Sequence, residues 1–169
     1  IILNDIPNDS LFAKQWALAT LRATDAWQIT AGVRDVLVAV IDTGIELDHP
    51  DLQPNLWINA KEDLNQNQLR DETDFNQVDD DNNGFVDDII GWDFTDAPNF
   101  PDGDDYLERD NDPSDRYGHG TAVAGVIGAV ANNRLGIAGL APNCRVMVLR
   151  AGNARGFLEE DDVASAIVY

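Results

Sequence analysis

The stretch that decides the fold is Val36-Leu37-Val38-Ala39-Val40-Ile41, which runs directly into Asp42-Thr43-Gly44. A run that is apolar at every position and mostly β-branched is typical of a strand covered on both faces, as in the parallel sheets of α/β proteins. Residues 36–41 are therefore predicted to form a buried strand of an α/β fold. Asp42 comes at the carboxyl end of that strand, where open α/β sheets bind ligands and place catalytic groups.

The rest of the chain supplies elements that suit this fold class. Residues 145–150 form a second apolar run and are predicted to be another buried strand. Residues 120–131 are apolar on all sides with closely spaced small residues, which predicts a buried helix packed tightly against a sheet. Acids open a further predicted helix over residues 159–166. Residues 23–29 predict a short helix and residues 7–16 an amphipathic arm, and we expect both to lie on a core rather than form it.

Acidic residues are concentrated in one segment. The chain has 31 Asp and Glu against 11 Lys and Arg, a net charge of −20. Residues 42–115 hold 23 of these acids and only three of the bases, so the remainder of the chain is neutral overall. This balance argues against nucleic acid as a partner, because such a partner requires a positively charged surface. The local concentration favours a role such as binding cations over a uniformly charged surface.

Length and composition are those of one ordinary domain or part of a larger one. The 169 residues are 44% hydrophobic, which is enough to build a core. No apolar run reaches the ~20 residues of a membrane helix, and residues 1–5 lack the pattern of a signal peptide. We therefore expect a soluble chain from which any export signal has been removed. A single cysteine, Cys144, rules out an internal disulfide, and a helical pattern that stops at Tyr169 without a cap predicts a fragment.

Residues 55–117 are predicted to be a long irregular excursion. No period persists there, no internal repeat is evident, and Asn, Asp, Gln, Gly and Pro dominate apart from short aromatic clusters. Loops of this length are uncommon in compact domains, and they are usually functional or braced by bound ions.

Asp42 and His119 are the candidate catalytic residues. His119 stands between Gly118 and Gly120 at the start of the predicted buried helix, whose N-terminus disfavours the charged imidazolium. A nearby carboxylate would orient the ring and stabilise the charge that it gains as a general base. Taken singly, each residue has a plainer interpretation, Asp42 as a turn cap and His119 as a helix cap. The other histidine, His49, lies beside a proline-fixed turn and is interpreted as structural.

Two motifs, taken in order, resemble those of the subtilisin-like serine peptidases. Residues 38–45, followed by His49-Pro50-Asp51-Leu52, resemble the aspartate motif of that family. Residues 118–125, which read Gly-His-Gly-Thr-Ala-Val-Ala-Gly, resemble its histidine motif. The turn after the predicted helix also matches, at Asn133, Gly136, Gly139, Ala141 and Pro142. The order of Asp before His is that of the subtilisin type and not of the chymotrypsin type.

The resemblance implies a three-layer, subtilisin-like α/β fold with a mostly parallel sheet, incomplete in this chain. Residues 1–169 would be the N-terminal portion of a peptidase domain, with an acidic insertion at about residues 55–117. The implied activity is that of a calcium-stabilised serine endopeptidase, which hydrolyses peptide bonds by acyl transfer. Asp42 would orient His119, the general base of a Ser-His-Asp triad.

The sequence departs from the family pattern in ways that affect activity. Ala122 stands where the family often has a second histidine, which removes no catalytic group. The serine motif Gly-Thr-Ser-Met-Ala and the oxyanion-hole asparagine are absent, and Ser10, Ser114 and Ser165 stand in no such setting. Because nucleophile and base act as a unit, the isolated chain is predicted to be inactive. The serine is expected on the C-terminal half of the same peptidase domain, which is the predicted protein partner.

Residues 79–88 begin as a calcium loop does, with oxygen-bearing side chains at alternate positions and Gly84 at the sixth position for a sharp turn. The predicted Ca²⁺ ligands are Asp79, Asp81, Asn83, the backbone carbonyl of Phe85, and Asp88. The twelfth position is Ile90 instead of glutamate, so Asp88 or Asp87 is expected to complete the set. The plainer alternative is a solvated acidic turn.

A second calcium site is implied by the resemblance alone. Family members often hold an ion between the N-terminal arm, the aspartate motif and the turn after the buried helix. The matching positions are Asp9, Asp51 and Asn133, with backbone oxygens of Ala131, Leu135 and Ile137. Turn chemistry is the plainer interpretation of Asp9 and Asn133. Asp110, Asp112 and Asp115 are left open between a further ion and a subsite for cationic substrates.

Two rival interpretations accompany the peptidase hypothesis. The first is a non-catalytic calcium-binding module that uses the same fold for adhesion or regulation. The second is one subunit of a nicked peptidase whose two pieces stay docked. A protein or peptide substrate is expected, an acidic rim favours basic peptides through electrostatic steering, and neither nucleic acid nor a membrane is expected as a partner. A secreted or periplasmic location fits calcium sites of the weaker extracellular type.

Overall fold

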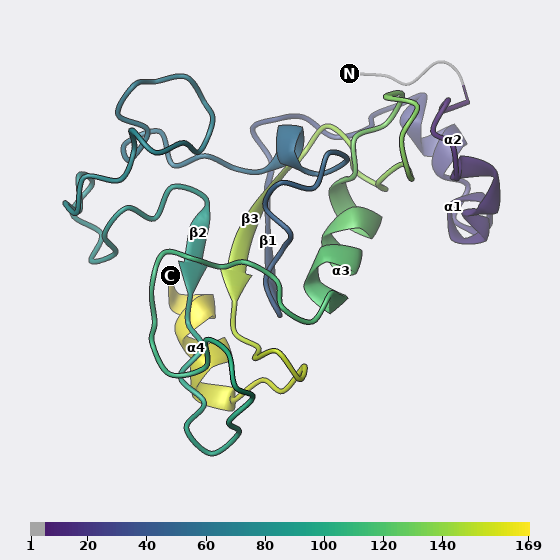
Figure 1. Cartoon of the computed structure of the whole chain (residues 1–169). Helices are drawn as coiled ribbons and strands as arrows, with labels where there is room; N and C mark the ends of the chain where they lie inside the picture. Colours follow the sequence, from purple (N-terminus) through teal and green to yellow (C-terminus); the bar gives the residue numbers. More distant parts are fainter. Residues whose placement is uncertain (1–5) are drawn as a thin grey trace. The chain divides into compact units, whose positions relative to one another are not determined.

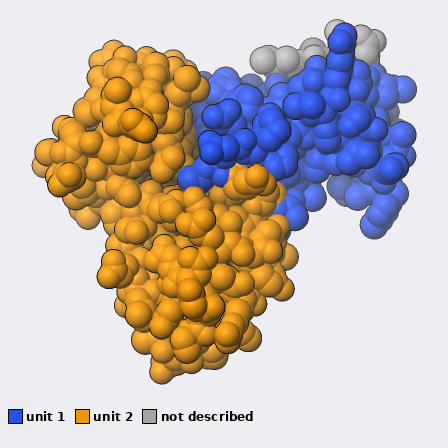
Figure 2. Space-filling model, in the orientation of Figure 1, with its two compact units in different colours: residues 1–38, 47–56, 122–146 blue, residues 39–46, 57–121, 147–169 orange. Residues whose placement is uncertain are grey.

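The structure is a computed structural model that describes residues 6–169. The chain forms two compact units, which Figure 2 shows in blue and orange. Unit 1 comprises residues 1–38, 47–56 and 122–146, and unit 2 comprises residues 39–46, 57–121 and 147–169. Among the described residues, no helix combines the length and the apolar character that crossing a membrane requires.

Unit 1 is built around short helices from the N-terminal part of the chain. They are η1 (Phe12–Lys14), α1 (Trp16–Thr20), α2 (Ala23–Trp27) and η2 (Gln53–Asn55). Leu18, Ala23 and Trp27 are buried and form a hydrophobic core with residues from later in the chain. The indole N–H of Trp27 donates to the carbonyl of Leu140 at 2.8 Å. The expectation that these segments lie on a core without forming it was therefore wrong, because Leu18, Ala23 and Trp27 are themselves core residues.

A three-stranded sheet connects distant parts of the sequence (Figure 1). Its strands are β1 (Leu37–Asp42), β2 (Gly91–Asp93) and β3 (Arg145–Arg150), in the order β1-β3-β2. β2 and β3 are parallel, and Gly91 lies opposite Val148 so closely that a Cβ at position 91 would fall on the Val148 carbonyl. The predictions of an α/β fold with a parallel sheet, and of a strand at residues 145–150, are confirmed.

Two predictions about burial were wrong. The strand at residues 36–41 was predicted to be buried on both faces, and the helix at residues 120–131 was predicted to be buried on all sides. Of β1 only Val40 is fully buried, while Leu37 is 39% exposed, because β1 is an edge strand of the sheet among the described residues. α3 (His119–Gly128) buries one narrow face that includes Ala124 and Gly128, while Val126 is 61% exposed. A Cβ at Gly128 would lie 2.7 Å from a methyl group of Val146, so glycine permits this close approach of helix to strand.

Unit 2 contains β2, α4 (Glu160–Val168) and the long acidic segment. α4 confirms the helix predicted at residues 159–166. A small core of Phe94, Leu149 and Ala166 is extended by partly buried aromatic side chains. Residues 57–88 contain neither helix nor strand and trace irregular loops (Figure 1). Hydrogen bonds from backbone N–H groups to carboxylate and amide oxygens of side chains therefore replace regular secondary structure there.

One buried ion pair joins two strands of unit 2. Arg150, at the end of β3, and Asp93, at the end of β2, are both fully buried, and their charged groups lie 2.7 Å apart. The guanidinium also donates to the backbone carbonyl of Asp105 at 2.6 Å. The charge of Arg150 is therefore satisfied entirely from within the unit.

Candidate active site

Asp42 and His119 lie in hydrogen-bond contact within unit 2, although 77 residues separate them in sequence. Asp42 is the last residue of β1 and His119 is the first residue of α3. Nδ1 of His119 lies 2.8 and 2.9 Å from the two carboxylate oxygens of Asp42. The Asp42 side chain is 14% exposed and that of His119 is 62% exposed, so the carboxylate is shielded while the imidazole faces solvent.

The environment of His119 suits a proton acceptor. The hydrogen bond that His119 donates to Asp42, together with the charge of that carboxylate, raises the pKa of His119 above its usual 6.5. Because Nδ1 is held by Asp42, the second ring nitrogen, Nε2, remains for proton exchange with another group. This arrangement of carboxylate and imidazole can carry general base catalysis once a nucleophile lies beside Nε2.

Two glycines allow the Asp and His segments to approach each other. A Cβ at Gly120 would collide with the carbonyl oxygen of Gly44 and would lie 3.1 Å from Cβ of Asp42. A Cβ at Gly44, whose φ is +96°, would lie 2.5 Å from the carbonyl of Pro113. The glycine after His119 therefore serves backbone packing against the loop that follows Asp42.

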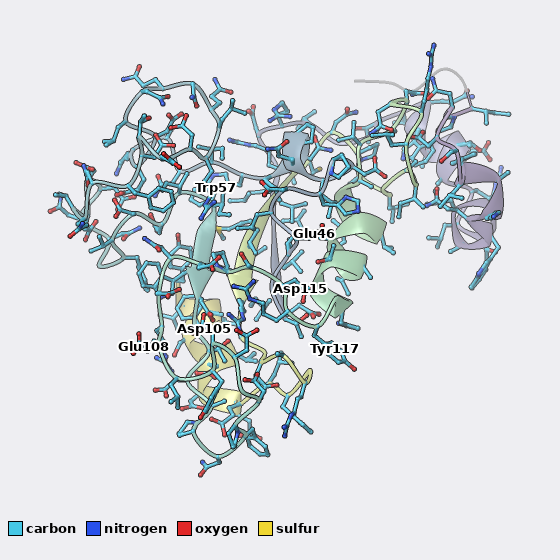
Figure 3. The ribbon with its side chains drawn as sticks, in the orientation of Figure 1. Glu46, Trp57, Asp105, Glu108, Asp115 and Tyr117 are labelled. Carbon is cyan, nitrogen blue, oxygen red and sulfur yellow. The ribbon has the colours of Figure 1, made fainter. Side chains whose placement is uncertain are left out.

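Asp115 fastens the turn that leads into α3, and Figure 3 shows it with Tyr117 beside the N-terminal end of that helix. One oxygen accepts from the backbone N–H groups of Tyr117 and Gly118 at 2.9 and 2.7 Å. The other accepts from the N–H and the hydroxyl of Thr121 at 3.0 and 2.5 Å. Burial alone would raise the pKa of Asp115, but these donors hold it below its usual value. Sequence analysis grouped Asp115 with possible ion ligands, whereas here its carboxylate is engaged by protein donors.

The neighbouring acids, Asp110 and Asp112, are also engaged locally. Asp112 accepts hydrogen bonds from the hydroxyl of Ser114 and, at 3.3 Å, from the guanidinium of Arg116. A carboxylate oxygen of Asp110 accepts from the N–H of Asp112 at 2.8 Å. Asp110 also belongs to a group with Asp93 and Asp105 whose ligand atoms lie within 4.8 Å of one another, and the buried Arg150 faces this group.

The predicted calcium loop adopts a tight turn in unit 2. Asp79 accepts hydrogen bonds from the N–H groups of Asn83 and Gly84 at 3.1 and 2.8 Å, and Asp81 accepts from Asn83 at 3.0 Å. The side-chain oxygen of Asn83 accepts from the N–H of Phe85 at 2.8 Å. The alternating acidic side chains therefore fold over the turn as the sequence pattern predicts.

Glu62 lies against this loop and was not among the predicted ligands. Its side chain is fully buried, one oxygen accepts from the N–H of Asp81 at 3.1 Å, and the other has no hydrogen-bond partner. Ligand atoms of Glu62, Asp79 and Asp81 all lie within 4.8 Å of one another. Burial raises the pKa of Glu62 above its usual value. Because Glu62 precedes the loop in sequence, no spacing rule within the loop could have found it.

Asp88, the last residue of the predicted loop, makes a different set of contacts. It accepts hydrogen bonds from the amides of Asn59 and Asn83, each at 2.8 Å, and from the hydroxyl of Tyr169. Burial raises the pKa of Asp88. The ring of Phe85 packs edge-on against aromatic side chains, with 5.1 Å between its centroid and that of Trp92.

The residues of the second predicted site come together within unit 1. Asp9 and Asp51 are 5% and 2% exposed. Asp9 accepts from the N–H groups of Asn132 and Asn133 at 2.9 and 3.4 Å. The Asn133 amide donates to Asp51 at 2.6 Å, and the N–H of Ile137 donates to the other oxygen of Asp51 at 3.0 Å.

The remaining members of that predicted set belong to the same turn. The N–H of Leu135 donates to the side-chain oxygen of Asn133 at 2.8 Å, and Ala131 packs against the core of unit 1. A Cβ at Gly136 would clash with the carboxylate of Asp51. The turn is therefore folded around two buried acids, and no basic side chain of residues 6–169 forms an ion pair with either of them.

Comparison with known proteins yields one family. A sequence model of the subtilase family matches residues 33–169. Subtilisin-like protease 1 of Plasmodium berghei (strain Anka) is 34% identical over 146 residues, which cover 85% of this chain and 21% of that protein. The thermophilic serine proteinase of Bacillus sp. (strain AK1) is 32% identical over 164 residues, and thermitase of Thermoactinomyces vulgaris is 29% identical over 164 residues. Those matches cover 96% of this chain and 30% and 43% of the two proteins.

Among solved structures, a protease from Pseudoalteromonas arctica PAMC 21717 is similar, with a TM-score of 0.68 and 26% sequence identity. The match covers 98% of this chain and 44% of that one. The chain thus spans less than half of the length of each of these relatives.

Proposed function

Because this chain belongs to the subtilase family, we propose that it supplies the aspartate and histidine of a Ser-His-Asp endopeptidase that hydrolyses peptide bonds by acyl transfer. The observation that carries the proposal is the hydrogen bond between Nδ1 of His119 and the shielded carboxylate of Asp42. Asp42 fixes the ring orientation and stabilises the imidazolium, while Nε2 of His119 accepts the proton of the serine nucleophile and then delivers it to the leaving amine.

The serine and the oxyanion-hole asparagine come from outside these 169 residues in this proposal. Neither Ser10, Ser114 nor Ser165 lies in a family serine motif. The isolated chain is therefore expected to hydrolyse no peptide bonds, since nucleophile and base act as a unit. Hydrolysis of a labelled protein substrate by the purified 169-residue chain, abolished by His119→Ala, would contradict this expectation.

The C-terminal half of the peptidase domain is the proposed protein partner. Exposed apolar side chains support this, since Leu37 on β1, Val126 on α3 and Val168 on α4 are 39%, 61% and 85% exposed. An edge strand also offers free backbone groups for pairing with another strand. Co-expression of the two halves as separate chains tests the proposal. The two halves should co-purify. Elution of each half as a separate species would contradict the proposed partnership.

Calcium is the proposed ion of the loop at residues 79–88. Its support is the unpartnered, buried oxygen of Glu62, whose carboxylate lies within reach of Asp79 and Asp81. Oxygen ligands on a flexible loop favour calcium over magnesium, which demands a stricter octahedron. Glu62 takes the part that a twelfth-position glutamate plays in an EF-hand loop. A calcium ion here neutralises clustered acids and braces the loop.

A second calcium is proposed between Asp9, Asp51 and Asn133, with backbone oxygens of Ala131, Leu135 and Ile137 completing the set. The two buried carboxylates support it, because buried acids are stable only when they are paired or bound to a cation. This ion would fasten the N-terminal arm within unit 1. Asp9→Asn should lower calcium stoichiometry by one ion, and an unchanged stoichiometry would argue for turn chemistry alone.

The acidic segment is proposed to favour basic peptide substrates. We expect faster association with basic peptides than with acidic ones, and a difference in kcat/KM that shrinks as salt is added. Salt-independent kcat/KM values would contradict this steering.

A secreted or periplasmic location is proposed because the calcium sites suit an environment rich in that ion. Cell fractionation with an antibody to this chain tests it, and recovery with the cytosolic fraction would count against it.

Labelling with a fluorophosphonate serine-hydrolase probe tests the activity itself. The natural protein is treated with the probe, with calcium and again with a chelator, and its intact mass is measured. An adduct that calcium removal abolishes, and that His119→Ala or Asp42→Asn greatly slows, is the expected result. Asp35→Asn is a matched charge control for Asp42→Asn, because Asp35 is exposed and outside the site. Absence of an adduct from folded protein would favour a non-catalytic calcium-binding module.

A further inference from the structure

Residues 63–74 form a second loop with the hydrogen-bond pattern of a calcium-binding turn. The carboxylate of Asp63 accepts from the N–H of Asn67 at 3.1 Å and from that of Gln68 at 2.8 Å. The side-chain oxygen of Asn65 accepts from the N–H of Asn67 at 2.9 Å. These bonds wrap the chain around the side chains at the first, third and fifth positions of the loop.

The predicted calcium loop contains the same hydrogen bonds. Each of its residues lies sixteen positions after the equivalent residue of the first loop, so that Asp79 corresponds to Asp63. Asp79 accepts from Asn83 at 3.1 Å and from Gly84 at 2.8 Å, as Asp63 does from its own partners. Asp81 takes the place of Asn65 and accepts from Asn83 at 3.0 Å. The sequence predicts no internal repeat, and this short structural repeat shows that prediction to be wrong.

Backbone dihedrals confirm that the two loops are equivalent. Gln66 and Gln68, at the fourth and sixth positions of the first loop, have φ of +58° and +62°. Asn82 and Gly84, at the same positions of the second, have φ of +58° and +98°. The sequence pattern concealed the first loop because a glutamine holds the left-handed sixth position, where glycine is usual.

The first loop also supplies oxygen atoms in the order that an EF-hand loop uses. Positions 1, 3, 5, 7, 9 and 12 of such a loop provide the ligands, the seventh through its backbone carbonyl and the ninth often through a water. The corresponding residues are Asp63, Asn65, Asn67, Leu69, Asp71 and Asp74. The amides of Asn65 and Asn67 both reach one carboxylate oxygen of Asp71, at 3.1 and 2.7 Å, so the third, fifth and ninth positions converge.

Asp74 provides an independent indication of a cation. It is fully buried, and its Oδ1 has no hydrogen-bond partner among the described residues. Its other oxygen accepts from the N–H of Asp71 at 3.0 Å, which directs the carboxylate into the loop. The one base of the loop, Arg70, lies over the ring of Phe75, 4.9 Å from its centroid, and forms no ion pair with a described acid. Buried charges in proteins are paired or coordinate a metal ion, so this unpartnered oxygen indicates a ligand in the loop.

We propose that residues 63–74 bind a calcium ion of their own, separate from the ion proposed for residues 79–88. Asp74 provides at the twelfth position the carboxylate that the later loop lacks, where Ile90 stands and Glu62 substitutes. This calcium site contains neither Asp42 nor His119 and does not depend on peptidase activity. The two ions together would brace the irregular segment that runs from Trp57 to the start of β2.

Counting bound ions in the full chain tests the proposal. The protein is stripped with a chelator, exchanged into volatile buffer, and titrated with calcium while native mass spectrometry counts the ions on folded molecules. Asp74→Asn is expected to bind one calcium fewer than the unaltered chain. Glu72→Gln is the matched control, because it makes the same charge change at an exposed position that is not a ligand position, and it should keep every ion.

Asn67→Ala provides a second variant in case Asp74→Asn fails to fold, since Asn67 is exposed. It should also lose one ion, and Glu62→Gln should lose a different one, so that the double variant Asn67→Ala/Glu62→Gln loses two. Folded Asn67→Ala that binds as many calcium ions as Glu72→Gln would overturn the proposal. Occupancy by magnesium in place of calcium under equal concentrations would overturn the choice of ion.

Discussion

The hydroxyl of Thr43 joins the two segments that carry the candidate catalytic residues. It donates to Asp115 at 3.0 Å and accepts from the N–H of Gly120 at 2.9 Å. Thr43 follows Asp42 and Gly120 follows His119, so each candidate residue has a neighbour in the same hydrogen-bond network. The distance between Asp42 and His119 is therefore set by backbone and hydroxyl contacts as well as by their own hydrogen bond.

We expect Asp115→Asn to destabilise the fold and to misplace His119. An amide has only one oxygen, so some of the donors from Gly118, Thr121 and Thr43 would lose their acceptor. The free energy of unfolding should fall by about 2 kcal/mol, the usual worth of hydrogen bonds to a charged group. Urea unfolding measures this fall, and Glu108→Gln, an exposed change of the same charge, should leave the midpoint in place. Equal midpoints for both variants would mean that Asp115 has no fastening role.

The titration of His119 should depend on Asp42. Its pKa is raised above 6.5 by the hydrogen bond to Asp42 and by that carboxylate's charge, so Asp42→Asn should shift the pKa downward. The stability that this contact contributes is fully present below pH 6.5 and is lost as the pH rises through the raised value. NMR titration of the imidazole protons measures the shift, and His49→Gln identifies the signal of the other histidine. A titration midpoint that is the same in Asp42→Asn would contradict the pairing.

The sequence predicts those features that depend on local pattern. The bounds of β3 follow from an apolar run whose ends are marked by Arg145 and Arg150, and both are confirmed residue for residue. The contact of Asp42 with His119 follows from two motifs whose order and flanking residues are specific. In each instance the information lies within a few consecutive residues.

The features that sequence analysis missed depend on tertiary structure. The exposure of Leu37 follows from the position of β1 in the sheet, which an apolar run does not encode. Glu62 meets Asp81 only because the irregular chain folds back, and its burial cannot be seen in a sequence where it is one acid among many. The loop ending at Asp74 was missed because Gln68 adopts a backbone conformation usually marked by glycine.

Calcium should stabilise the chain through Glu62. With free calcium at about 100 times its dissociation constant, one site that exists only in the folded state adds about 2.7 kcal/mol to the free energy of unfolding. Glu62→Gln should lose roughly that part of the calcium-induced stabilisation, because one ligand of the loop becomes a neutral amide. Urea unfolding with calcium and with a chelator measures the difference for each protein. Glu72→Gln is the matched control, and an equal response of the two variants would exclude Glu62 as a ligand.

Arg150→Met should be the most destabilising of these substitutions, because it leaves Asp93 buried without its cation. Removing one partner of a buried ion pair costs about 3–5 kcal/mol.

Burial raises the pKa of Asp93 to about 7 against the opposing effect of Arg150, so the native state favours a protonated Asp93. The contribution of protonated Asp93 to the free energy of unfolding is therefore lost as the pH rises through about 7. The cost of Arg150→Met should be larger above this pH than below it, because a neutral carboxyl group needs no cation beside it. Urea unfolding at the two pH values measures both effects, with the exposed Arg155→Met as the control for loss of a positive charge. A cost that does not change with pH would show that Asp93 stays ionised throughout, and a cost no larger than that of Arg155→Met would show that the pair contributes nothing to the fold.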